Sequence, residues 1–158
     1  MTATRLTIDT LFDAFFPPIV EESSGILRHR TIRVMNAIDR FLETEGERTL
    51  DPFDAAVLAA ERQFDPNGAF VRTMAAHNLV CALPLFLEDP WLHPEPLMQR
   101  VQLDVVQRLV AFVSANVPMD DAEVGPVLTL ISLRISTSRR ELNRAQKEAR
   151  RVREPPGE

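Results

Sequence analysis

Hydrophobic residues recur at intervals of three and four along most of the chain, which is the spacing of a helix that buries one face. The pattern is clearest between Gly25 and Glu45, where the apolar positions form a single stripe. The alternation typical of a strand is scarce, and only Val127–Ile135 is rich enough in branched residues to be ambiguous. The sequence therefore predicts an all-α protein.

Prolines and glycines divide this pattern into elements, and the chain has 12 prolines and 5 glycines. We expect Pro17 and Pro18 to end the first helix, because proline lacks the backbone donor that a helix uses. Gly46 should end the second helix. The pattern predicts a single-domain bundle of five or six helices. The expected helices span about Ile8–Phe16, Gly25–Glu45, Pro52–Gln63, Phe70–Leu83, Glu95–Ala115 and Gly125–Val152.

The apolar positions also predict which face each helix buries. The segment Phe70–Leu83 is apolar on most of its circumference, so we expect it to be the central helix, with Leu79 and Leu83 in the core. Trp91 lies in a proline-rich connection and should fold back on the core. The residues expected to point inward are Phe53, Ala56, Val57, Ala60 and Phe64 in the third helix, and Leu97, Val101, Val105, Leu109 and Phe112 in the fifth.

The last helix carries the most regular pattern in the chain. Its stripe steps by three and four residues without a slip, and seven of its eight positions are apolar. From Ser136 onward only this narrow stripe is apolar, so we expect one long helix whose second half projects from the bundle. The stripe consists of Leu128, Ile131, Ile135, Ser138, Leu142, Ala145, Ala149 and Val152.

Charge divides the chain at nearly the same point. Residues 1–133 carry 10 arginines against 19 acidic residues, whereas residues 134–158 carry 8 basic residues against 4 acidic ones. We therefore expect an acidic helical bundle over residues 1–135 and a basic helical extension over residues 136–158, disordered from Pro155. No apolar run approaches the roughly 20 residues of a membrane span. We expect a cytoplasmic protein that does not enter the membrane.

The candidate chemistry is sparse. His77 and Cys81 stand four residues apart on a helix and could pair as base and thiol, but their apolar surroundings favour a packed, buried cysteine. The acidic residues near Asp89 and Asp120 lack the spacing of a metal-binding loop, and no glycine-rich phosphate loop is present. We expect no catalytic residue, no cofactor and no metal ion.

Three arginines of the second helix, Arg30, Arg33 and Arg40, share one face and could lie along a phosphate backbone. The same helix also carries Asp39 and Glu43, which weaken the positive field. We interpret these arginines as a solvated flank and keep them as the alternative nucleic-acid-binding residues.

These observations predict a protein–protein interaction or assembly module that is not an enzyme. Its last helix would form a coiled-coil homodimer or dock on another protein. One alternative is a small DNA-associated regulatory protein that binds through the basic tail, and another is a ligand-binding or enzymatic bundle without a local motif. The expected partner-binding residues are Ile135, Leu142, Ala145, Ala149, Val152, Arg139, Arg140 and Arg144.

Overall fold

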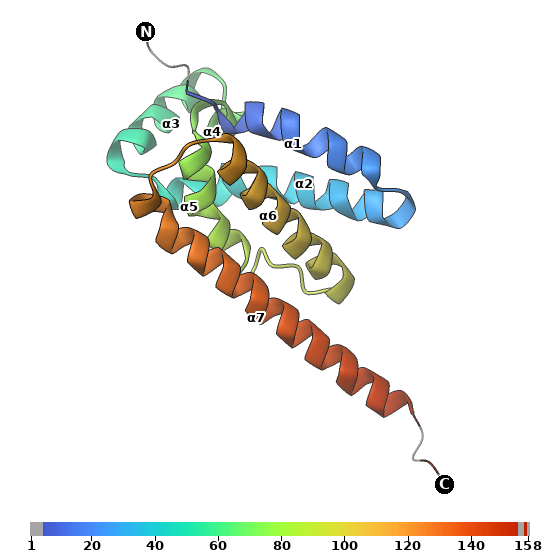
Figure 1. Ribbon diagram of the computed structural model, residues 1–158. Coiled ribbons are helices and arrows are strands. Elements are labelled where there is room, and N and C mark those ends of the chain that lie inside the picture. Colours follow the sequence, from blue (N-terminus) through green and yellow to red (C-terminus); the bar gives the residue numbers. More distant parts are fainter. Residues whose placement is uncertain (1–4, 155–156, 158) are drawn as a thin grey trace.

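The computed structural model describes residues 5–154 and residue 157, so most of the expected disordered end, at residues 155, 156 and 158, lies outside the described residues. The described chain is an all-α, single-domain fold with a long last helix, as predicted, and it contains seven α-helices (Figure 1). The helices are α1 (Ile8–Glu22), α2 (Gly25–Glu45), α3 (Pro52–Phe64), α4 (Ala69–Thr73), α5 (Ala76–Phe86), α6 (Pro96–Asn116) and α7 (Asp121–Arg153), with a short 3-10 turn, η1 (Gly46–Thr49).

Helix α1 does not end at its two prolines. It continues to Glu22 with Pro17 and Pro18 inside it, contrary to the prediction. Both prolines are exposed, so the carbonyls that lose a partner in the preceding turn can be hydrated. The last turn is held by buried Ile19, whose carbonyl accepts a hydrogen bond from Ser23 Oγ at 2.7 Å. Burial of the apolar side of α1 thus offsets the loss of two backbone donors at Pro17 and Pro18 on its exposed side.

Helix α2 has the predicted bounds, but Gly46 plays a different part from the one expected. It stays in the right-handed region and begins η1 instead of forming a left-handed cap. A Cβ at this position would lie 2.6 Å from Cε2 of Phe70, and Phe70 is fully buried. Glycine is required here because an aromatic ring packs directly on the backbone.

The predicted central helix is interrupted. Helices α4 and α5 are separated at Met74 and Ala75, where the chain forms an antiparallel bridge with Thr7. The amide of Ile8 donates to the carbonyl of Met74 at 3.0 Å, and Asn78 Oδ1 accepts from the Ala75 amide at 3.0 Å. The Ile8 amide, at the start of α1, and the Asn78 side chain, on α5, therefore replace helical hydrogen bonds at the break.

Despite that break, α5 is central as predicted. Leu79 and Leu83 are fully buried. Helix α5 continues through Pro84 to Phe86, and α7 packs along it (Figure 1).

Helix α3 is turned the other way from the prediction. Its buried residues are Asp54 and Leu58, whereas Phe53 is 74% and Phe64 is 87% exposed. Ala56, Val57 and Ala60 are exposed with them. A buried hydrogen bond sets this orientation. Asp54 accepts from Asn78 Nδ2 at 3.1 Å, so the face of α3 that carries Asp54 packs against α5.

Helix α6 follows the prediction in its middle, where Val101, Val105 and Leu109 are buried. Phe112 is only partly buried, and Leu97 is 50% exposed because it lies in the first turn, at the edge of the body. The expected inward position of Leu97 is therefore wrong.

The connection before α6 folds back on the core through Trp91, as predicted. The Trp91 ring meets the Phe41 ring edge-on, with centroids 5.3 Å apart. The buried Gln102 side chain holds the connection, because it accepts from the His93 amide and donates to the carbonyls of Phe86 and Trp91.

Helix α7 is one continuous element of 33 residues, about 50 Å long at about 1.5 Å per residue. It begins at Asp121, earlier than predicted, because Asp120 caps it by accepting from the Ala122 amide at 3.0 Å. Pro126 lies inside the helix instead of opening it. Among the described residues, no helix has both the length and the apolarity needed to cross a membrane.

Candidate interaction surfaces

The first half of α7 is part of the bundle, and its packing reaches further than the sequence predicted. Helices α6 and α7 run antiparallel, so Arg139 donates to Asp104 at 2.7 Å, and Arg100 donates to Asn143 at 3.1 Å and to Gln146 at 3.3 Å. Gln146 is the last α7 residue that is hydrogen-bonded to the body. The described residues beyond it, 147–154, are all exposed, because the antiparallel helix α6 begins at Pro96.

This packing divides the predicted partner-binding residues into two groups. Ile135 is 4% and Leu142 is 9% exposed, and Arg139 is paired with Asp104. These three residues serve the chain's own packing, because α6 extends far enough to cover the stripe up to Leu142. The expected boundary at residue 136 therefore does not separate packed from projecting residues.

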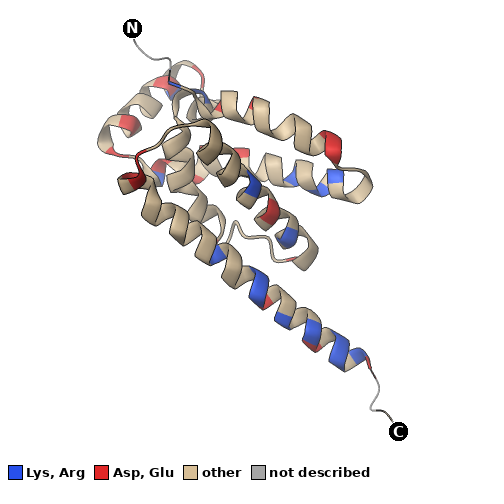
Figure 2. Ribbon diagram, viewed as in Figure 1, with Lys and Arg blue, Asp and Glu red and all other residues tan. Residues whose placement is uncertain are grey.

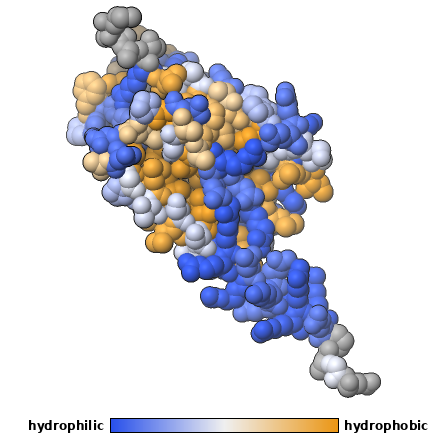
Figure 3. Space-filling model, in the orientation of Figure 1, coloured by the Kyte–Doolittle hydropathy of each residue, from blue (hydrophilic) through white to orange (hydrophobic). Residues whose placement is uncertain are grey.

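The second group forms what we call the projecting end, residues 144–153. Every residue in it is exposed, including Ala145, Ala149 and Val152. It carries five cations and the single carboxylate of Glu148. Figure 2 shows basic residues gathered on the lower half of α7, and Figure 3 shows this end as almost wholly hydrophilic against the apolar patches of the body.

The cations of the projecting end have no partners on the described part of the chain. Among the described residues, no carboxylate lies within 4.0 Å of the basic groups of Arg144, Lys147, Arg150, Arg151 or Arg153. The same holds for Arg140, which is exposed on the turn before. The positive charge of this end is therefore available to a partner.

The outward side of α3 forms a second surface, which we call the outer α3 face. It has the spacing of an apolar helix face but lies in solvent. An exposed apolar surface of this kind is often an interaction site. The stripe can be seen in the sequence but its direction cannot, because the hydrogen bond of Asp54 with Asn78 joins residues far apart in the chain. The face consists of Phe53, Ala56, Val57, Ala60 and Phe64.

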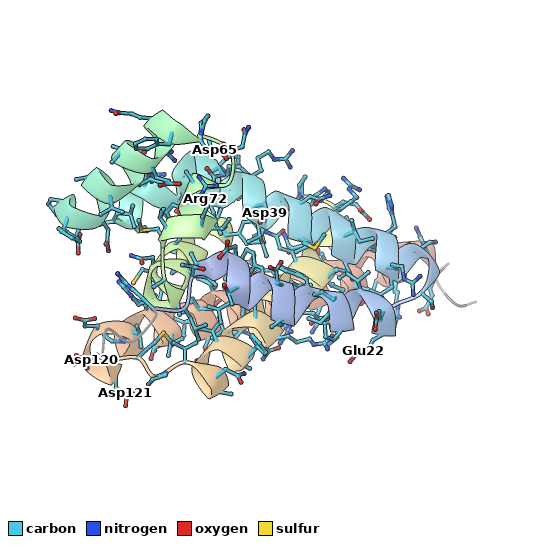
Figure 4. The ribbon with its side chains drawn as sticks, turned by 90° about the horizontal axis from the view of Figure 1, so that it is seen from above. Glu22, Asp39, Asp65, Arg72, Asp120 and Asp121 are labelled. Carbon is cyan, nitrogen blue, oxygen red and sulfur yellow. The ribbon has the colours of Figure 1, made fainter. Side chains whose placement is uncertain are left out.

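A third surface is an open groove of about 520 Å³ between α1 and α2, which we call the α1–α2 groove. Seen from above, the two helices lie side by side with Asp39 on α2 (Figure 4). The floor is apolar and includes Phe12, Phe16 and Met35. The carboxylates that line it are Asp9, Asp13, Glu21 and Asp39.

These groove carboxylates form no ion pair with any described cation. Burial raises the pKa of Asp39, and the nearby Glu43 carboxylate raises it further. Only the smaller effect, that of Glu43, comes from neighbouring negative charge, and a cation placed in the groove would counter it. The sequence contained a signal for this groove, because Asp9, Asp13 and Glu21 are spaced in multiples of four beside the apolar stripe of α1.

The pair His77 and Cys81 is not arranged for thiol chemistry. His77 contacts Arg5, whose Nη2 lies 3.1 Å from Nδ1, and its Nε2 lies 3.9 Å from Oδ2 of Asp54. Cys81 is half-buried, not fully buried as predicted. Burial raises the pKa of its thiol, and the Glu123 carboxylate adds to this, so the neutral and unreactive form is favoured.

A pocket of about 340 Å³ lies beside this cluster and is lined by Arg5, His77, Asp120 and Glu123 among others. Among the described residues, no three His, Cys, Asp or Glu side chains are grouped so as to hold a metal ion.

The arginines of α2 are only partly brought together. Arg33 and Arg40 line a small pocket of about 80 Å³ with Trp91 and His93, but Arg30 does not. None of the three arginines has an ion-pair partner among the described residues. They offer a shallow basic edge and not a deep anion site.

Comparison of the chain with protein-family models, with curated proteins and with solved structures finds no match.

Proposed function

We propose that this protein is a non-enzymatic protein–protein interaction or assembly module that docks through the projecting end of α7. The observation that carries this proposal is that every residue of 144–153 is exposed and that α7 continues past Gln146, its last residue hydrogen-bonded to the body. An isolated helix of this length would be marginal in water. Here the packed first half of α7 nucleates it, so the end is presented already folded.

The composition of the projecting end indicates the kind of partner. Ala145, Ala149 and Val152 lie on one side of the helix, and their small size lets a partner approach closely. Arg153 flanks that side on one edge and Arg144 on the other, whereas Arg150, Arg151 and Lys147 lie further round, toward the opposite side of the helix. This arrangement suits an acidic, grooved surface. Because the apolar side chains are small, we expect a modest affinity.

The outer α3 face supports the same class of function. Phe53 and Phe64 are both more than two-thirds exposed, at 74% and 87%. Exposing two phenylalanines on one helix leaves apolar surface in water that a partner could cover.

Binding to DNA through the basic end is a second candidate, which is favoured by the unpaired cations of residues 144–153. Both candidates use the exposed cations and weaken as salt rises, so they differ in whether binding needs the apolar stripe. Contacts with phosphates weaken steeply as salt rises and do not need Ala149. A protein partner packed on the stripe does need Ala149.

The test compares two variants that each lower the charge of the chain by one. Ala149→Glu places a carboxylate in the stripe, and Lys147→Gln removes a cation on the opposite side of the helix. Neither residue contacts the body, so we expect both variants to melt as the wild type does. In a quantitative binding assay with partners recovered by the wild-type chain, Ala149→Glu should lose binding and Lys147→Gln should retain most of it.

Equal losses in the two variants would favour the nucleic-acid candidate. Full binding by both variants would show that the projecting end is not the docking element.

A further inference from the structure

We infer that the projecting end of α7 docks in the α1–α2 groove of a second copy of this chain, so that the protein assembles head to tail. The inference rests on the proposed function and names its partner. Three features of the described residues carry it: charge, dimensions and placement.

Charge is the first feature. The groove presents four carboxylates, those of Asp9, Asp13, Glu21 and Asp39, and none is paired with a described cation. The projecting end presents five cations and one carboxylate. Opposite charges that both lack a partner within the monomer can neutralise one another between two copies.

The dimensions also agree. From Asp9 to Glu21 the groove follows α1 for about 18 Å, and the ten residues of the projecting end span about 15 Å, both at about 1.5 Å per residue. The groove floor is formed by large side chains such as Phe12, Phe16 and Met35. The matching side of the projecting end is formed by Ala145, Ala149 and Val152, which are small enough to approach a bulky floor.

Placement requires that the contact be between copies. Helix α7 packs on α5 and α6, and its projecting end points away from α1 and α2 (Figure 1). A continuous helix cannot bend back to its own groove. Because the tail and the groove are different surfaces, the contact is heterologous and produces rings or chains.

The experiment exchanges charge between the two surfaces. The groove variant is Asp13→Arg with Glu21→Arg, and the tail variant is Arg144→Glu with Arg153→Glu, the two cations nearest to the stripe of small residues. Circular dichroism and thermal melting confirm that each variant is folded. Sedimentation velocity then measures the average mass of wild type, of each variant and of their equimolar mixture across a range of concentrations.

We expect the mass of the wild type to rise with concentration, and each variant alone to associate at least about tenfold more weakly, because like charges then face each other. The mixture should regain the association. In it, a wild-type tail meets a wild-type groove, and a reversed tail meets a reversed groove. The control variant, Arg140→Glu with Lys147→Glu, reverses two cations on the opposite side of α7 and should keep most of the association.

A mixture that associates no better than its separate variants would overturn the inference, as would a wild type that stays monomeric at about millimolar concentration. If the wild type is monomeric while Ala149→Glu loses binding to a different protein, the inference that the partner is a second copy of this chain is wrong, and the proposed function stands. If Ala149→Glu loses nothing, the proposed function itself is wrong.

Discussion

The structural role of a residue in this chain depends on its contacts more than on its type. Gly46 and Gly125 illustrate this. Both are glycines with helical neighbours, but a Cβ at Gly46 would meet the ring of Phe70 at 2.6 Å, while a Cβ at Gly125 would meet nothing within 4 Å. The sequence offers a reason for a glycine at position 46, namely the end of a helix, and the structure supplies a different one.

Replacing these glycines by alanine should therefore have opposite effects. Gly46→Ala forces the buried Phe70 ring to shift and should lower the free energy of unfolding by about 1–3 kcal/mol. Gly125→Ala is the control: it lies within α7 in open space, and it should raise that free energy by up to about 1 kcal/mol. Urea denaturation of both variants measures the difference. Equal effects would mean that Phe70 does not pack on Gly46.

At the scale of elements, the predictions succeeded where local pattern decides and failed where distant contacts decide. The bounds of α2 follow from its apolar spacing together with Gly46, and the unbroken course of α7 follows from its apolar stripe. The break between α4 and α5 does not, because it depends on the bond from the Ile8 amide to Met74. Nor does the direction of α3, which depends on Asp54 and Asn78.

The candidate site divides in the same way. The exposure of Ala145, Ala149 and Val152 could be predicted, because from Ser136 onward only a narrow stripe is apolar and charged side chains flank it. The burial of Ile135 and Leu142 could not, because it depends on how far α6 extends beside α7. The α1–α2 groove also depends on tertiary packing, since its walls come from two helices.

The orientation of α3 makes a direct prediction about two apolar residues on one helix. Leu58 is fully buried and Phe64 is 87% exposed. Leu58→Ala should lower the free energy of unfolding by about 2–5 kcal/mol through lost burial and a cavity. Phe64→Ala removes a larger side chain but should change the free energy of unfolding by no more than about 0.5 kcal/mol, because Phe64 is exposed. The reverse order would mean that α3 buries the face predicted from the sequence.

At the scale of the whole molecule, the chain joins an acidic-walled groove on one side to a basic helix end on the other. The bundle core fixes both, because α1 and α2 form the groove and α5 and α6 anchor α7 (Figure 1). The unpaired charges of each surface are solvated in the monomer, and docking would bring them together. We therefore expect the association between copies to weaken as salt rises, because its contacts are largely between exposed charges.

Hydrogen exchange measured by mass spectrometry at increasing protein concentration is the most direct test of docking between the projecting end and the α1–α2 groove. The amides of residues 144–153 have little around them in the monomer and should exchange readily. If the two surfaces dock, the exchange of these amides slows as concentration rises, and so does that of the α1 amides beside the groove. The exchange of the α3 amides stays unchanged. Exchange at residues 144–153 that does not depend on concentration, in a chain that is shown to associate, would contradict this docking.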